Sequence, residues 1–400
     1  MSKKRIMILG AGRGQVELIK ASKRLGYEAI VASIKGNYPG FEYADQISYV
    51  DITSKNDVLQ SAKEYNIDAI ATSCMDTAIS TLGYVCDECN LAGLNSKSAE
   101  ISGDKLLMKK AFIENDVNTA KYIKVNSENE LEEVTKKLQL PLIVKAVDLQ
   151  GSRGINIVNT KDSLLDAYKR TMAETSKDFC IIEEFIEGYE FGAQAFIYNG
   201  EVLYVLPAGD ITYTGVTKVP VGHYMPLEFE NDVLQQIEEN VKKAINAIGL
   251  DNCAVNIDMI IRDGKIYIIE LTGRVGANCL AELSSIYYGI DVYAMIAMTA
   301  MGEDVKKYFE ENRKAPTACY ARMLMSDKTG VLKSLENNNK PNPDIAEITF
   351  FVQEGDTVNK FTNSRDCIGQ IIVKGKDIIT CEKLIDEVIA NLEIEIEIEE

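Results

Sequence analysis

The sequence has no tryptophan and only one histidine among its 400 residues. With a single histidine, His223, and no second cysteine pair near Cys86 and Cys89, a zinc site is not expected. No run of 18 apolar residues occurs, so no membrane-spanning helix is expected. Basic residues are also scarce, with 43 Lys and Arg against 61 Asp and Glu and a formal net charge of −18. This balance argues against a nucleic-acid partner, although a local basic pocket for a small anion remains compatible with it.

Nine cysteines, an odd number, are scattered through apolar segments, which is typical of reduced thiols in a protein core. Cys86 and Cys89 form a CxxC pair, but no second pair lies nearby and the segment has helical spacing. We therefore interpret this pair as structural. The N-terminal MSKKRIMILG has an apolar run of only about five residues, which indicates a first β-strand and not a signal peptide. We expect a cytoplasmic protein.

Hydrophobic periodicity predicts three regions. Residues 1–95 alternate strands and helices, which indicates a parallel sheet with crossover helices. Residues 96–310 read as α+β and largely antiparallel, with a lid subdomain at about 116–186. Residues 311–400 are rich in β-strands. The stretch 207–226, rich in Gly, Thr and Tyr, is predicted to be a pocket loop.

The segment GAGRGQ, residues 10–15, follows the first strand and opens a helix. Its glycine spacing is one position short of the dinucleotide fingerprint G-x-G-x-x-G, and no acidic residue follows the second strand. NAD(P) binding is therefore disfavoured. Two interpretations remain, namely a tight strand–helix turn or a cradle of backbone N–H groups around Gly12 for a substrate carboxylate or phosphate.

The segment PLIVKAVDLQGSRGI, residues 141–155, predicts a phosphate clamp. Lys145 ends an apolar strand, where its ammonium must reach solvent or meet an anion. Lys105, in SGDKLLMKK, is a second cationic candidate, with a solvated helix face as the alternative. A flexible hairpin with uncovered backbone amides and a hydroxyl follows Lys145. Its residues are Gly151, Ser152, Arg153 and Gly154.

The segment IIEEFIEGYEFGAQ, residues 181–194, holds the groups that a purine nucleoside needs, in chain order. Those groups are an apolar slot, backbone hydrogen bonds, an acceptor for the amino group and a carboxylate for the ribose. An ordinary surface strand is the alternative. The residues concerned are Glu183, Glu184, Phe185, Ile186 and Glu190.

Asp258 and Glu270 each lie in an apolar strand, and Asp263-Gly264 between them is a hairpin signal. Counting outward from this turn places the two carboxylates nearly opposite one another. They would repel unless one is protonated or a cation lies between them. Oxygen ligands favour Mg²⁺ or Mn²⁺ over zinc. A coupled structural pair is the alternative, and Arg274 follows at the strand exit.

Taken in order, these residues resemble the ATP-grasp ligases, and the resemblance covers essentially the whole chain. It rests on Lys105, Lys145, the GSRG loop, EEFIEG-x-E and the set Asp258…Glu270-x-x-x-Arg274. The resemblance implies an ATP-grasp fold with a Rossmann-like, parallel-sheet (pre-ATP-grasp) N-terminal domain. It also implies a small β-rich C-terminal domain like that of biotin-carboxylase-like members.

The resemblance further implies a role for each residue. Lys105 and Lys145 would contact the phosphates of ATP, and the loop at Ser152 would close over them. Asp258 and Glu270 would bind two Mg²⁺, with Mn²⁺ as the substitute. The nucleoside would be held by Glu183 at the adenine amino group, by the hinge Glu184, Phe185 and Ile186, and by Glu190 at the ribose.

One position departs from the family pattern E-x-N-x-R, because Thr272 stands where many members have an asparagine metal ligand. Arg274 would stabilise an acyl phosphate. The segment GRVGAN, residues 273–278, partly matches the R-x-G-G of amino-acid ligases, with Gly276 as the matching glycine. His223-Tyr-Met-Pro226 resembles the His-x-x-Pro of the same group, which implies a role as hydrogen-bond partner or base. Asp76 is predicted to bind a substrate ammonium or to cap a helix.

The expected activity is that of an ATP-dependent carboxylate–amine ligase that acts on small molecules through an acyl phosphate and releases ADP and phosphate. One alternative is a carboxylase-type or carbamoyl-phosphate-type enzyme that phosphorylates bicarbonate. Another is a nucleotide-binding regulatory protein whose metal site has decayed, for which Thr272 is the best support. The sequence leaves the oligomeric state open, with a homodimer as the candidate because it is the commonest soluble oligomer.

Overall fold

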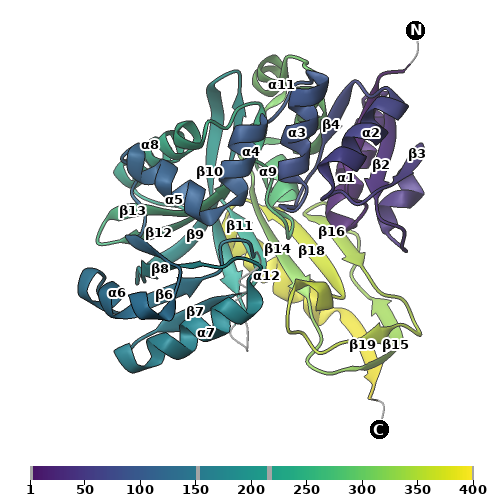
Figure 1. Ribbon diagram of the computed structural model, residues 1–400. Helices are drawn as coiled ribbons and strands as arrows, with labels where there is room; N and C mark the ends of the chain where they lie inside the picture. The colour runs from purple at the N-terminus through teal and green to yellow at the C-terminus, as the bar shows by residue number, and fades with distance from the viewer. Residues whose placement is uncertain (1–2, 150–153, 214–218, 399–400) are drawn as a thin grey trace. The chain divides into compact units, whose positions relative to one another are not determined.

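The computed structural model describes residues 3–149, 154–213 and 219–398 (Figure 1). The chain packs into two compact units, each built from several segments. Unit 1 comprises Met1–Val205, Phe229–Val275 and Tyr293–Lys306. Unit 2 comprises Leu206–Glu228, Gly276–Val292 and Lys307–Glu400. The division into three domains near residues 95 and 310 stays a prediction.

The first sheet of unit 1 is parallel, as the alternation of strands and helices predicts, and its strand order is β3-β2-β1-β4. β1 is buried from Ile6 to Leu9, a continuous apolar run that is typical of a strand covered on both faces. β3 is missed by the sequence pattern because QISY has too few apolar residues. The elements are β1 (Arg5–Leu9), α1 (Arg13–Arg24), β2 (Glu28–Ser33), η1 (Pro39–Tyr43), β3 (Gln46–Tyr49), α2 (Lys55–Tyr65), β4 (Ala69–Ala71) and α3 (Ile79–Cys89).

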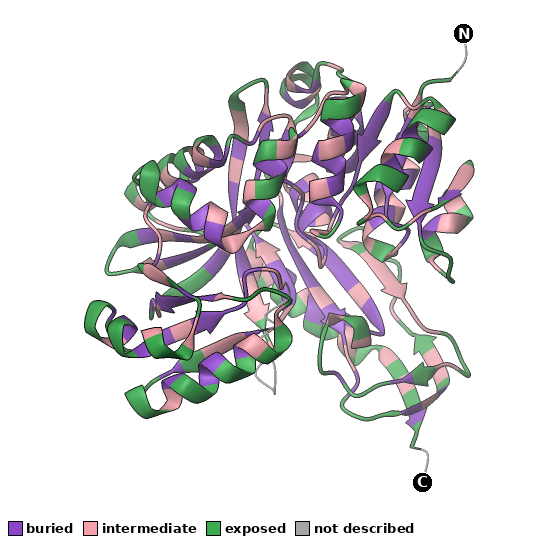
Figure 2. Cartoon of the chain, viewed as in Figure 1, coloured by how far each residue is buried: buried purple, intermediate pink, exposed green. Residues whose placement is uncertain are grey.

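The second sheet of unit 1 is antiparallel, with the order β5-β8-β6-β7. Two helices pack their apolar residues, among them Val134 and Tyr168, into its core and expose their other side (Figure 2). The elements are α4 (Ser96–Gly103), α5 (Lys105–Glu114), β5 (Tyr122–Val125), η2 (Glu128–Glu130), α6 (Leu131–Lys137), β6 (Leu142–Lys145), β7 (Ile155–Val158), η3 (Lys161–Ser163), α7 (Leu164–Glu174) and β8 (Cys180–Glu184).

A third set of strands in unit 1 has the order β13-β12-β9-β10. The predicted hairpin turn at Asp263-Gly264 is confirmed, and Asn199-Gly200 forms a second turn of the same kind. Asn199 and Gly200 have φ of 50° and 77°, and Asp263 and Gly264 have φ of 50° and 71°, as a tight two-residue turn requires. The elements are β9 (Tyr189–Tyr198), β10 (Glu201–Thr212), α8 (Asn231–Ile248), β12 (Cys253–Arg262), β13 (Lys265–Thr272) and α10 (Val292–Ala300).

Unit 2 has the strand orders β10-β11-β14-β18-β16 and β17-β15-β19, around a core that includes Leu332, Ile371 and Ile385. The prediction of a pocket loop at 207–226 is wrong where strands occupy it, because β10 extends to Thr212 and β11 spans Pro220–Met225. Residues 214–218 of this stretch lie outside the described residues. The elements are β11 (Pro220–Met225), α9 (Leu280–Tyr288), α11 (Val305–Asn312), β14 (Ala318–Leu324), β15 (Gly330–Asn337), β16 (Ile345–Phe350), β17 (Thr357–Val358), η4 (Ser364–Asp366), β18 (Gly369–Gly375), α12 (Ile378–Ala390) and β19 (Leu392–Glu397).

None of the nine cysteines, all of which the structure describes, forms a disulfide. Cys86 is buried in α3, and burial raises the pKa of its thiol to about 12, so it is not a thiolate at neutral pH. The structural interpretation of the CxxC pair agrees with this. Within the described part of the chain, no helix is both long enough and apolar enough to cross a membrane.

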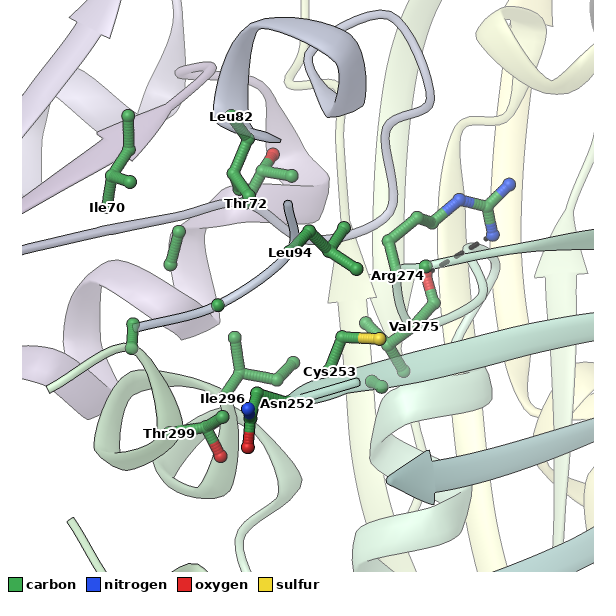
Figure 3. A pocket seen from close by; sticks show the side chains of 15 residues that line it. Ile70, Thr72, Leu82, Leu94, Asn252, Cys253, Arg274, Val275, Ile296 and Thr299 are labelled. Carbon is green, nitrogen blue, oxygen red and sulfur yellow. Dashed lines mark hydrogen bonds between the residues drawn. The ribbon is translucent and has the colours of Figure 1, made fainter. Parts of the chain in front are cut away.

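A small pocket of about 40 Å³ lies within unit 1, where β4, the start of β12, the turn Gly273–Val275 and α10 meet (Figure 3). Its lining is mostly apolar, and it is far too small for a nucleotide. Thr299 of α10 is one of its polar lining residues and is 3% exposed. Its Oγ1 has no hydrogen-bond partner among the described residues, which is a costly arrangement for a buried hydroxyl.

We expect Thr299→Val to stabilise the protein by about 1 kcal/mol, because it replaces an unpaired buried hydroxyl with a methyl group of similar size. Urea denaturation would measure the change. The matched control is Thr171→Val, since Thr171 is equally buried but its Oγ1 accepts a hydrogen bond from Asn156 at 2.9 Å, and its loss should destabilise. A destabilised Thr299→Val variant would contradict the prediction.

Candidate functional site

The two carboxylates singled out by the sequence face one another across a hairpin. Asp258 of β12 and Glu270 of β13 are direct partners in the antiparallel register. Counting from the turn alone would pair Asp258 with Ile269, one residue short. A β-bulge shifts the register between Asp258 and Met259, which leaves Ile269 unpaired and brings Glu270 opposite Asp258. Such bulges re-aim side chains, so the bulge is what creates this carboxylate pair.

Lys105 stands beside the carboxylate pair and not on a solvated helix face. Its Nζ lies 3.3 Å from Oε1 of Glu270 and donates a hydrogen bond to the backbone oxygen of Leu149 at 2.9 Å. The Lys105 side chain is 13% exposed. The lysine therefore links a predicted metal ligand to the segment that leads into the glycine-rich loop.

Two buried lysines share the carboxylate of Glu183. Nζ of Lys145 lies 3.0 Å and Nζ of Lys109 lies 3.2 Å from Oε2 of Glu183, which is 1% exposed. Burial raises the pKa of the Glu183 carboxyl, but the two ammonium groups outweigh this effect and hold the pKa below its usual value. The cluster carries one excess positive charge, which suits a site for an anion.

Lys109 was not among the residues that the sequence singled out. It lies four positions after Lys105 in LLMKK, so the two share one face of α5, and this spacing was the available signal. Burial lowers the pKa of Lys109 to about 8 in spite of Glu183. The second oxygen of Glu183, Oε1, is buried and has no hydrogen-bond partner among the described residues. It can accept a hydrogen bond from a ligand.

In the predicted hinge after Glu183, the first two backbone N–H groups already donate hydrogen bonds within the protein. The N–H groups of Glu184 and Phe185 donate to Lys121 O and Pro141 O, each at 2.9 Å. Carbonyl oxygens are therefore what this part of the segment offers to a purine. Ile186 packs in an apolar cluster with Ala120 and Ile260, and Glu190 is exposed on β9.

Most of the predicted phosphate loop, namely Gly151, Ser152 and Arg153, lies outside the described residues. Gly154 is described, and its N–H is not uncovered as predicted, because it donates to Oε2 of Glu174 at 2.9 Å. Its φ of +64° and the close approach of Ala146 leave no room for a side chain.

Arg274 and Asp76 form an ion pair within unit 1, with 2.5 Å between Nε and Oδ1. Asp76 is not the cap of α3, whose N-cap position is Ala78. Burial lowers the pKa of the Arg274 guanidinium, but Asp76 outweighs this effect and the pKa is raised. A second bond joins Nη1 of Arg274 to the backbone oxygen of Val275 (Figure 3). Asp76 thus holds a cation of the chain itself, while its role towards a substrate ammonium stays a prediction.

The turn at Gly12 satisfies its own hydrogen bonds. Gly12 N–H donates to Oε1 of Gln15 at 3.0 Å, and Nε2 of Gln15 donates to Ser73 O at 2.5 Å. Gln15 is 2% exposed and so occupies the mouth of the turn. This geometry agrees with the tight-turn interpretation, and a dinucleotide would have to displace Gln15.

His223 lies in unit 2 on β11, directly opposite Asp210 of β10. The imidazole is buried, and its Nδ1 lies 2.7 Å from Oδ1 of Asp210. Asp210 was missed by the sequence analysis because its segment was interpreted as a loop. An aspartate at Nδ1 fixes the ring and leaves Nε2 as the atom for other partners. Gly276 also belongs to unit 2 and follows the last residue of β13 by four positions.

We expect the burial of Lys109 to make the free energy of unfolding increase with pH in the alkaline range. Between pH 8 and the ordinary lysine pKa of 10.5, the unfolded chain holds a proton that the folded chain has lost, so stability rises with pH. The difference in unfolding free energy between wild type and Lys109→Met should grow in favour of wild type by roughly 3 kcal/mol over this range. Denaturation series at several pH values would measure it, and a flat or falling difference would contradict it.

Asp76→Asn should leave the buried guanidinium of Arg274 without its counter-charge. We expect a loss of about 3 kcal/mol in unfolding free energy, because breaking a buried ion pair leaves an uncompensated charge. Asp386→Asn, at an exposed position of α12, is the matched control and should change stability by less than about 0.5 kcal/mol. Equal effects of the two substitutions, measured by chemical denaturation, would argue against the ion pair.

Two family models match the chain. Residues 103–278 match "Phosphoribosylglycinamide synthetase, ATP-grasp (A) domain". Residues 322–397 match "L-amino acid ligase C-terminal domain 2". Among curated proteins, the formate-dependent phosphoribosylglycinamide formyltransferase of Prochlorococcus marinus (strain MIT 9301) is 27% identical over 281 residues, which span 68% of this chain and 70% of that protein.

Comparison with solved structures leads to the same group of proteins. The phosphoribosylglycinamide synthetase from Anaerococcus prevotii is 48% identical, with 99% of this chain and 100% of that chain covered and a TM-score of 0.89. The L-amino acid ligase from Bacillus licheniformis shares the fold at 18% identity, with 99% and 100% covered and a TM-score of 0.83. With a relative of 48% identity along essentially its whole length, the chain belongs to the ATP-grasp family of ligases, as its residues predict.

Proposed function

We propose that this protein is an ATP-dependent carboxylate–amine ligase that works through an acyl phosphate and joins an amino acid or another small carboxylate to an amine. The observation that carries the proposal is the direct opposition of Asp258 and Glu270, with Nζ of Lys105 at 3.3 Å from Glu270. Two facing carboxylates with an ammonium beside them form a site for a cation–phosphate complex. A homodimer and a cytoplasmic location remain predictions.

The residues present fit Mg²⁺. Asp258 and Glu270 supply carboxylate oxygens, and the buried Oγ1 of Thr272 lacks a hydrogen-bond partner among the described residues. Among those residues no group of three or more His, Cys, Asp or Glu side chains could hold a metal ion, so Mg²⁺ would need phosphate oxygens and water as further ligands. When bound, the metal neutralises phosphate charge during transfer.

The lysines and Glu183 bind and orient the nucleotide in this proposal. Lys105 and Lys145 place positive charge where phosphates develop negative charge, and Lys109 keeps Glu183 ionised. Oε1 of Glu183, buried and without a partner among the described residues, is the acceptor for the adenine amino group. Phe185 with its neighbours forms the hinge, and Glu190 holds the ribose.

Arg274 acts on the acyl phosphate, the intermediate that forms when the substrate carboxylate is phosphorylated. A substrate carboxylate attacks the terminal phosphorus of ATP, ADP leaves, and the amine then displaces phosphate from the acyl carbon. Asp76 holds the Arg274 guanidinium in one orientation, so it can stabilise the acyl phosphate without rearranging. We propose that His223, oriented by Asp210, is the hydrogen-bond partner or base for the substrate. Gly12 and Gly276 stay as proposed substrate contacts.

Two substrate sets are favoured by particular observations. The match of residues 322–397 to an L-amino acid ligase domain favours two amino acids. The name of the 48% identical relative favours glycine with 5-phosphoribosylamine. Both sets fit a carboxylate–amine ligase. Bicarbonate is the remaining carboxylate to test, because it would indicate the carboxylase alternative.

The test is phosphate release from Mg·ATP with amino-acid pairs, with glycine and 5-phosphoribosylamine, and with bicarbonate. We expect release to need a carboxylate, and to fall by about 100-fold or more in Glu270→Gln, which removes a carboxylate from the cation site. Glu88→Gln, at an exposed position of α3, is the matched control and should keep full activity. Added hydroxylamine should trap the acyl phosphate as a hydroxamate whose mass identifies the carboxylate.

Phosphate release with bicarbonate alone and no hydroxamate with any carboxylate would overturn the acyl-phosphate ligase in favour of the carboxylase alternative. Tight ATP binding without turnover across the whole panel would favour the regulatory alternative.

A further inference from the structure

A row of polar side chains lies next to the carboxylate pair. The register places Gln194, Asn256 and Thr272 side by side on β9, β12 and β13. The row two residues further along contains Asp258 and Glu270. Residues two apart in a strand face the same side of the sheet, so this row and the carboxylates share one surface.

The hydrogen bonds in this row run in one direction, towards the carboxylate. Nε2 of Gln194 donates to Ala193 O at 3.1 Å and to Oδ1 of Asn256 at 2.7 Å. Nδ2 of Asn256 then donates to Oδ1 of Asp258 at 3.3 Å. A backbone carbonyl and a carboxylate can only accept, so both ends of the row fix the orientation of the amides between them.

Burial makes the row rigid at its far end. Gln194 is 1% exposed and Asn256 is half-buried, so the bond between them is shielded from water. Two bonds from one buried amide nitrogen leave Gln194 little freedom to rotate. Asn256 therefore presents its N–H to Asp258 in a fixed direction. Gln194 orients Asn256, and Asn256 in turn orients the carboxylate of Asp258.

Thr272 stands directly opposite Asn256, at the position where the family resemblance places an asparagine. It is 6% exposed, and its Oγ1 has no hydrogen-bond partner in the described part of the chain. Side chains directly opposite one another on antiparallel strands have Cβ atoms about 4.5–5.5 Å apart. An amide at 256 therefore reaches the same carboxylates that an amide at 272 would reach.

We infer that Asn256, held by Gln194, is the positioning residue for Asp258 and supplies from β12 the amide that position 272 on β13 lacks. The inference rests on the proposed function, since it assigns a role towards the divalent cation of that site. Asn256 acts through Asp258, by setting the rotation of its carboxylate. Removing such a partner of a metal ligand costs about 10- to 100-fold in metal affinity.

The experiment measures Mn²⁺ affinity by electron paramagnetic resonance with the non-hydrolysable analogue AMP-PNP and without carboxylate or amine substrates. Asn256→Leu and Asn256→Thr should each weaken Mn²⁺ binding by about tenfold or more and change the spectrum of the bound ion. The transposed variant, Asn256→Thr with Thr272→Asn, should regain most of the affinity. Asn156→Leu, in β7, is the matched control and should bind Mn²⁺ as wild type does.

Unfolding free energies of all variants show whether each is folded under the conditions of the binding measurement. Wild-type Mn²⁺ affinity in Asn256→Leu and Asn256→Thr would overturn the inference. So would a transposed variant that binds Mn²⁺ no better than Asn256→Thr. If wild type itself binds no Mn²⁺ with AMP-PNP, the proposed function fails, and the inference fails with it.

Discussion

The direct opposition of Asp258 and Glu270 is the constraint on which the candidate site in unit 1 depends. Like-charged carboxylates that face one another repel, so the pair calls for a cation or hydrogen-bond donors nearby. The bulge at Ile269 creates the opposition, Lys105 lies against one carboxylate, and Asn256 donates to the other. Although the chain has a net charge of −18, it places Lys105 beside the two carboxylates that the β-strand register brings together.

The buried cluster of Lys109, Lys145 and Glu183 extends the same principle to a second place. One carboxylate there holds two ammonium groups, so positive charge is in excess, whereas the hairpin has negative charge in excess. An anionic phosphate chain that carries a cation complements both imbalances. The two clusters therefore have excess charge of opposite sign within one unit, and the proposed complex of ATP with Mg²⁺ would complement both.

Local signals in the sequence predicted much of this structure. Asp263-Gly264 flanked by apolar runs predicted the β12–β13 hairpin, and a tight turn was one of the two interpretations of the glycine spacing at Gly12. The bulge was not predictable, because nothing in YIIELT shows which residue the ladder skips. The loop predicted at 207–226 was wrong where β10 and β11 pair, because β-strand pairing overrode a composition rich in Gly and Thr. The burial of Lys109 and the partner of Asp76 depend on segments far away in the chain.

The ion pair between Asp76 and Arg274 joins residues 198 positions apart. A ribosome that adds about 5 to 20 residues per second needs about 10 to 40 s to make the chain between them. Until Arg274 has been made, the loop after β4 carries the Asp76 carboxylate without its guanidinium partner. This ion pair therefore forms only after 198 further residues have been added to the chain, so the loop after β4 reaches its final electrostatic state long after it is made.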